Sequence, residues 1–204
     1  MDFTLSPEFE SLRVRTRAFV EEHVLPLEAD SENFSAHENI PLDRLAPVQE
    51  KARQAGLWAP QSPKEFGGMA LPIVAWAVMY EEAARSIFGP LALNCMAPDD
   101  GNMSLLAKVG TPKQKEWWLR PIVEGKVKSS FAMTEPAPGG GSDPSMIMTR
   151  AERSGGDQRM RVEEARPRDG TGGARSVERK DQVRDVDAEI AVQSALTGHL
   201  VLST

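Results

Sequence analysis

The chain has 204 residues, of which 40% are hydrophobic, enough apolar content for a folded core in one or two small domains. Its formal net charge of −6 argues against a surface for nucleic acid or for an anionic membrane. Because Cys95 is the single cysteine, an internal disulfide is excluded, and three scattered histidines offer no cluster of metal ligands. We expect a cytoplasmic protein: no leader segment is visible, and the longest mostly apolar run, residues 71–80, is too short to span a membrane.

Helical periodicity dominates the first 125 residues. Ser6 is a good N-cap, and Pro7 occupies the first helical position, where its missing N–H costs nothing. Apolar residues then recur at helical spacing, and we expect Pro26 to end this helix. A second helix is predicted over residues 46–55, with Gly56 as its C-terminal stop.

The remaining helices follow in close succession. Residues 71–85 are apolar nearly all round and predict a buried helix, closed by Gly89 and Pro90. Residues 101–109 form a further helix before Gly110.

The next helix has the most legible start in the sequence. Thr111 is an N-cap and Gln114 completes a capping box, so a helix should run from there to Pro121. Trp117 and Trp118 cannot share one face of that helix, so we expect one in the core and the other at a contact with a neighbouring domain or subunit.

From Lys126 onward the period changes to that of strands. Residues 127–133 and 145–151 read as two strands, joined by a loop with a hydroxyl at Thr134 and three successive glycines. Such a loop offers bare backbone on which a flat or phosphorylated group can lie, although a plain surface turn gives the same pattern. It is not a P-loop, since no Gly-Lys-Ser/Thr follows, and Pro144 stands where a nucleophile elbow needs glycine.

The segment FAMTEPAPGGGSD, residues 131–143, resembles the flavin-binding signature of acyl-CoA dehydrogenases. Supporting motifs lie upstream in the family's order: GLWAP at 56–60, PKEFGG at 63–68, GTPKQK at 110–115 and LRP at 119–121. The resemblance extends to about residue 158. It implies a mainly α fold: an N-terminal helical bundle over residues 1–125, then the first strands of a β-barrel-like middle domain over residues 126–158.

The resemblance also implies an activity, the α,β-dehydrogenation of an acyl-CoA thioester with hydride transfer to FAD. Phe131, Met133 and Thr134 would then line the flavin. Gly141 and Ser142 would approach the cofactor's phosphates, with Ser142 also near the CoA part of the substrate. Two extra residues relative to the commonest form of the motif leave the register of the glycines open. Residues 94–102 would face the acyl chain, or else form a polar helix junction.

No catalytic residue is assigned, because the family's catalytic glutamate lies in a C-terminal helical domain that nothing in this sequence resembles. We expect Glu135 and Asp143 to be carboxylates of the turn, and the adjacent Asp99 and Asp100 to diverge into solvent. The resemblance further implies partners: acyl-CoA as substrate, electron-transfer flavoprotein as electron acceptor, and a homo-oligomer in full-length relatives.

The character of the chain changes after Gln158, beyond which there is no Phe, Tyr or Trp. Its mixed charge and few large apolar residues predict a disordered tail over residues 159–204, with enough apolar content for a short helix only over residues 190–202. A reading frame shifted near codon 158 explains such a tail, and a purposeful tail is the alternative. Two functions therefore remain open: a truncated, inactive acyl-CoA dehydrogenase, and a non-catalytic module that binds acyl-CoA or a protein partner.

Overall fold

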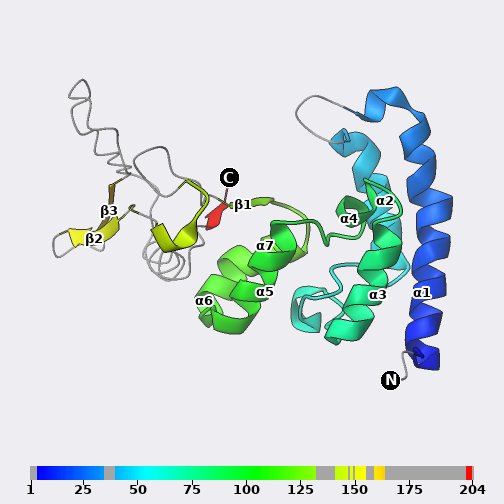
Figure 1. The fold of residues 1–204 in the computed structure, drawn as a ribbon, viewed down its shortest axis with the longest axis horizontal. Coiled ribbons are helices and arrows are strands. Elements are labelled where there is room, and N and C mark those ends of the chain that lie inside the picture. Colours follow the sequence, from blue (N-terminus) through cyan, green and yellow to red (C-terminus); the bar gives the residue numbers. More distant parts are fainter. Residues whose placement is uncertain are drawn as a thin grey trace. The chain divides into compact units, whose positions relative to one another are not determined.

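The computed structural model describes residues 4–34, 40–131, 141–146, 148, 150–154, 159–163 and 201–203. The chain divides into two compact units, Met1–Lys128 and Ser129–Thr204. The first unit is helical, and the described elements of the second are short strands and one 3-10 turn (Figure 1). The predicted fold class, mainly α with strands after the helical region, is confirmed.

Helix α1 (Pro7–Phe19) begins as predicted, because the Ser6 hydroxyl accepts a hydrogen bond from the N–H of Phe9 at 3.3 Å. It continues into a π-turn, η1 (Val20–Val24), and then into 3-10 segments, η2 (Leu25–Ala29) and η3 (Ser31–Asn33).

Helix α2 (Leu42–Gln54) begins four residues before the predicted start and contains Pro47 in its interior. Its buried side chains lie on both sides of the proline, so packing of this face outweighs the local cost of an interior proline. Gly56 ends the helix as predicted: with φ of +65° it closes a Schellman motif, in which the N–H of Gly56 bonds the carbonyl of Arg53 and that of Leu57 bonds the carbonyl of Ala52.

Helix α3 (Ile73–Ala83) packs along α1, and Figure 1 shows the two lying side by side. The prediction of burial on most sides is wrong for one face of the helix, where Ile73, Val74, Ala77 and Glu81 are exposed, whereas Ala75, Val78, Met79, Glu82 and Ala83 are buried. Gly89 begins the short helix α4 (Gly89–Ala92) rather than closing α3. A Cβ at Gly89 would lie 1.9 Å from the carbonyl oxygen of Ala83, so only glycine permits this approach.

A short 3-10 turn, η4 (Lys64–Phe66), lies between α2 and α3. After α4, the helical unit continues with α5 (Asp99–Val109), α6 (Pro112–Gln114), the π-turn η5 (Lys115–Leu119) and α7 (Arg120–Val123).

The predicted capping box is present. The N–H of Gln114 bonds the Thr111 hydroxyl at 3.3 Å, and the N–H of Thr111 bonds the Gln114 side chain at 2.7 Å. Trp117 is 39% exposed and Trp118 is half-buried, so the two rings do lie in different environments.

Two prolines do not end their helices as predicted. Pro26 and Pro121 each follow a π-turn, Val20–Val24 or Lys115–Leu119, and each is one of the first two residues of a new helical segment. A proline ring clashes with the carbonyl four residues earlier in an α-helix. The π-turn shifts the backbone bonds to the carbonyl five residues back and restarts the helix at a position that needs no N–H. The chain therefore stays helical through both prolines.

The second unit contains two antiparallel pairs: β1 (Ser129–Phe131) with β4 (Val201–Ser203), and β2 (Arg150–Ser154) with β3 (Arg159–Glu163). A 3-10 turn, η6 (Pro144–Met146), replaces the start of the strand predicted over residues 145–151, because the Asp143 carboxylate binds the N–H of Ser145. A short helix was predicted over residues 190–202, but residues 201 and 202 belong to strand β4. Strand β3 also lies within the predicted tail, of which residues 164–200 and 204 lie outside the described residues.

The core of the helical unit is formed by side chains from its helices and from the loop after α2. Its largest fully buried apolar side chains are Phe88, Ile40, Leu57, Met79, Leu93, Met103, Leu119, Ile122, Val20, Val24 and Val123. This continuous core holds the elements that surround the carboxyl end of α7.

Candidate functional site

The two ends of the proposed flavin loop fall among the described residues. Phe131 is the last residue of β1, and Gly141 and Ser142 begin the turn before η6. Met133 and Thr134 lie outside the described residues, as does Glu135. The cofactor assignments of Phe131, Met133, Thr134, Gly141 and Ser142 all stay predictions, as does the place of Glu135 in the turn.

The turn at Gly141 presents open backbone. Gly141 has φ of +60°, and nothing in the described part of the chain lies within 4 Å of the position that a Cβ would take. The side chain of Ser142, which follows, is exposed.

Asp143 belongs to the turn, as predicted. One of its carboxylate oxygens accepts hydrogen bonds from the N–H of Ser145 at 2.9 Å and from the Ser145 hydroxyl at 2.7 Å. The hydroxyl and then the N–H of Ser145 hold the pKa of Asp143 below its usual value. A carboxylate stabilised in its charged form inside a turn is a poor proton acceptor.

Residues 94–102 contain several buried polar side chains, as a polar helix junction would, and that they face an acyl chain stays a prediction. Asn94, Asp99 and Asn102 are 1%, 4% and 4% exposed. The two adjacent aspartates diverge, as expected, but toward protein partners rather than solvent. Asp99 pairs with the Lys128 ammonium at 3.2 Å, and Asp100 accepts the Tyr80 hydroxyl at 3.3 Å.

Cys95 lies in the same junction and is 3% exposed. Burial raises the pKa of its thiol to about 12, and the nearby Asp100 carboxylate adds to the shift. Burial likewise raises the pKa of Tyr80 far above its ordinary value. Both groups stay protonated at neutral pH, so neither serves here as a nucleophile or base.

The carboxyl end of α7 is held by its own backbone and by side chains from distant elements. Gly125, with φ of +70°, forms a Schellman motif: its N–H bonds the carbonyl of Ile122 at 3.0 Å, and the N–H of Lys126 bonds that of Pro121 at 2.9 Å. The pattern was missed in the sequence because the helix was expected to end at Pro121.

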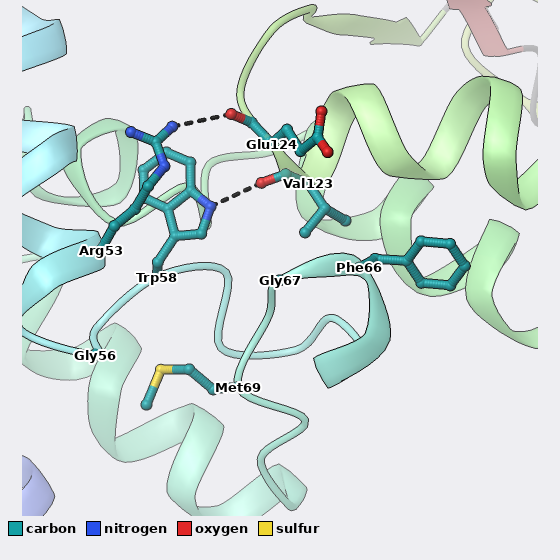
Figure 2. A pocket seen from close by; sticks show the side chains of 8 residues that line it. All are labelled: Arg53, Gly56, Trp58, Phe66, Gly67, Met69, Val123 and Glu124. Carbon is teal, nitrogen blue, oxygen red and sulfur yellow. Dashed lines mark hydrogen bonds between the residues drawn. The ribbon is translucent and has the colours of Figure 1, made fainter.

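Three side chains donate to the last carbonyls of this helix, and Figure 2 shows two of them, Arg53 and Trp58. The indole N–H of Trp58 bonds the carbonyl of Val123 at 2.7 Å, and the Arg53 guanidinium bonds that of Glu124 at 2.9 Å. The Asn94 amide reaches the carbonyls of Ile122 and Val123, both at 3.1 Å. We call the side chains of Arg53, Trp58 and Asn94 the α7 cap.

A surface hollow of about 260 Å³ lies beside the α7 cap. In Figure 2, the Arg53 guanidinium stacks on the Trp58 indole, 3.8 Å from its ring centroid. The hollow is lined by Arg53, Gly56, Trp58, Phe66, Gly67, Met69, Val123 and Glu124. Nothing in the sequence alone placed these residues together, since they come from three separated segments.

The described part of the chain offers neither a metal-binding cluster nor a membrane-spanning helix. There, no group of three or more His, Cys, Asp or Glu side chains could hold a metal ion. No helix among those residues is both long enough and apolar enough to cross a membrane.

Comparison with known proteins gives one consistent family. The domain described as acyl-CoA dehydrogenase, N-terminal domain, matches residues 6–126. FadE2 of Mycobacterium tuberculosis, named as a probable acyl-CoA dehydrogenase, is 39% identical over 163 residues, which cover 77% of this chain and 39% of that protein. The chain spans about two fifths or less of the length of the first curated relatives it matches.

Solved structures agree on the fold. An acyl-CoA dehydrogenase from Geobacillus kaustophilus is 27% identical, with a TM-score of 0.56, and the match covers 80% of this chain and 40% of that one. An acyl-CoA dehydrogenase from Bacillus anthracis, crystallised with FAD, has a TM-score of 0.56 at 24% identity, over 78% of this chain and 26% of that one.

Proposed function

Because the chain belongs to the acyl-CoA dehydrogenase family, we propose that its residues serve the α,β-dehydrogenation of an acyl-CoA thioester, with FAD as the hydride acceptor. The observation that carries this proposal is the family match over residues 6–126, followed in the chain by β1 and by the open turn at Gly141. When bound, FAD supplies the electron sink that no amino-acid side chain can provide.

The roles proposed for individual residues follow the family signature. Phe131, Met133 and Thr134 line the flavin ring, where backbone N–H groups and the Thr134 hydroxyl can bond its polar edge. The open backbone at Gly141 admits the cofactor's phosphates, and the Ser142 hydroxyl donates to them or to the CoA part of the substrate. Further partners on this proposal are an electron-transfer flavoprotein and a second copy of the protein.

A chimera tests the proposed activity. Residues 1–158 of this chain replace the matching part of FadE2, so that the remainder of a relative supplies what this sequence does not match. The proposal expects a yellow protein whose flavin absorbance bleaches anaerobically on addition of an acyl-CoA. A chimera that folds and retains FAD, yet is not bleached by any acyl-CoA, would overturn it.

Ser142→Ala in the same chimera tests the role of the hydroxyl. One lost hydrogen bond to a charged phosphate, worth about 1 to 2 kcal/mol, weakens FAD or acyl-CoA binding roughly five- to thirtyfold. Ser145→Ala is the matched control, because its hydroxyl bonds Asp143 inside the same turn. Equal effects of the two substitutions would assign Ser142 to the turn alone.

We propose further that this chain does not dehydrogenate acyl-CoA by itself. A base must lie within hydrogen-bonding reach of the proton at the α carbon, and its loss costs about a hundred- to ten thousandfold in rate. Asp143 is tied to Ser145, and no residue of this sequence matches the family's catalytic glutamate. Binding of FAD by the isolated chain should also be weak, so gel filtration of a mixture with FAD should give a colourless protein.

The second candidate function is a non-catalytic module that binds an acyl-CoA. The core of the helical unit favours it, since the buried apolar side chains that the structure describes all come from this unit itself. Calorimetric titration of the isolated chain with an acyl-CoA, without flavin, separates the two candidates. Heat of binding supports the non-catalytic module, whereas the absence of any heat of binding favours the truncated dehydrogenase.

A further inference from the structure

We propose that the α7 cap fixes the segment by which the chain leaves the helical unit, residues 124–128. Arg53, Trp58 and Asn94 are on this account positioning residues, which act through the backbone of that segment. The inference does not depend on the proposed function.

The first argument is an accounting of backbone groups. The last four carbonyls of a helix have no partner within the helix. The Schellman motif at Gly125 satisfies those of Pro121 and Ile122. The α7 cap satisfies those of Val123 and Glu124 and adds a second donor at Ile122. All four carbonyls are therefore bonded to protein groups, which leaves this helix end little freedom to fray.

The second argument is the origin of the donors. Arg53 comes from α2, Trp58 from the loop that follows α2, and Asn94 from the turn after α4. They lie 71, 65 and 28 or 29 residues from their acceptors along the chain. A helix can be capped by its own neighbouring residues, as by the N-cap at Ser6 and the capping box at Thr111. Three donors from separate elements tie this exit to the whole helical unit.

The third argument is the backbone conformation of Asn94. Its φ of +52° is left-handed, a region that is uncommon outside glycine but that Asn adopts more readily than most residues. Its amide is shared between two carbonyls, and its side chain is 1% exposed. This conformation delivers one buried amide to the end of α7.

The fourth argument is the packing around Gly125. A Cβ there would lie 3.0 Å from both the Arg53 guanidinium nitrogen and the Trp58 ring. Further along, the Lys128 ammonium pairs with Asp99, a buried residue five positions after Asn94. Residues 124–128 are therefore held at their start by the α7 cap. At their end, Lys128 holds them to the polar junction of residues 94–102.

The test is amide hydrogen exchange of the full chain, without flavin, read by mass spectrometry. Trp58→Phe removes the donor and keeps an aromatic ring, and the peptide covering residues 126–131 should exchange about tenfold faster. Arg53→Met should give a smaller increase, about threefold, because this side chain is partly exposed. Arg53→Lys restores a donor of similar reach and should return exchange close to the original rate.

Gln49→Met is the matched control. Its amide donates to the carbonyl of Leu91 at 3.0 Å, so the substitution also removes one side-chain hydrogen bond between separated elements of the helical unit. It should leave exchange in residues 126–131 unchanged, once rates are compared at equal free energy of unfolding. Equal acceleration by Gln49→Met, no acceleration by either cap variant, or no rescue by Arg53→Lys would overturn the proposal. Since no flavin is present, the result is independent of whether the dehydrogenase proposal holds.

Discussion

Glu82, the penultimate residue of α3, binds Arg17 of α1, and its side chain is 2% exposed. Arg17 donates to both of its oxygens, at 2.7 and 2.9 Å, and Arg13 and Arg85 approach to 3.5 and 3.9 Å. The hydrogen bonds from Arg17 lower the pKa of Glu82 against the opposing effect of burial. A buried charge is tolerated at this position because its partners surround it.

Glu82→Gln should lower the free energy of unfolding by about 2 kcal/mol at pH 7, because the arginines lose a charged partner in a buried position. A carboxylate whose pKa is depressed on folding contributes its full stability above its ordinary value of 4.5 and loses it as the pH falls through the folded pKa. The difference between the two proteins in urea denaturation should therefore shrink below pH 4.5. The control is Glu116→Gln, which removes an exposed pair with Arg120 and should leave the free energy of unfolding nearly unchanged. A difference that grows toward acid pH would contradict the assignment.

Cys95 should resist alkylation in the folded chain. A pKa raised from 9.0 to about 12 lowers the thiolate fraction roughly a thousandfold, and the side chain is also buried. Iodoacetamide at pH 8, followed by mass spectrometry, should modify the thiol only after urea unfolds the chain. Similar rates with and without urea would mean that the junction around residues 94–102 opens readily.

At the scale of elements, the helix starts and stops show what a sequence can predict. The N-caps Ser6 and Thr111 and the stop at Gly56 are correct, because each is decided by residues within one turn. The prolines at 26 and 121 were misread because a π-turn depends on how the whole helix packs.

The α7 cap lay beyond sequence reasoning for the same physical reason. Its donors are far along the chain from their acceptors, and no local pattern records such a pairing. The sequence did contain one signal, Gly125 shortly after the apolar residues of α7, because a glycine at that place is typical of a Schellman motif. In the structure, this glycine is left-handed.

Gly125→Ala should lower the free energy of unfolding by about 1 to 3 kcal/mol, because the methyl group enters a left-handed backbone and meets Arg53 and Trp58 at 3.0 Å. Gly101→Ala is the control: it lies in α5 with open space around its Cβ position, and it should be neutral or stabilising by up to about 1 kcal/mol. Thermal denaturation of the two variants gives the comparison. A harmless Gly125→Ala would show that the exit from α7 adapts freely.

At the scale of the whole molecule, the sequence motifs predicted the family and the helical fold. They did so because the ordered motifs are spread along the part of the chain that forms the core. The candidate site was predicted only in part. Gly141 has the expected open backbone and Asp143 the expected place in a turn, whereas the hollow beside Trp58 arises from packing between distant segments.

We propose that this chain provides the helical unit and a flavin-binding strand of an acyl-CoA dehydrogenase, and that the catalytic base comes from a part of the family's sequence that nothing here matches. Anaerobic absorbance of flavin, recorded side by side for the isolated chain with FAD and for the FadE2 chimera, tests this most directly. With a panel of acyl-CoAs, the chimera should bleach and the isolated chain should not. Bleaching by the isolated chain that disappears in Glu135→Gln would contradict the account, because a carboxylate assigned to the turn would then be the base.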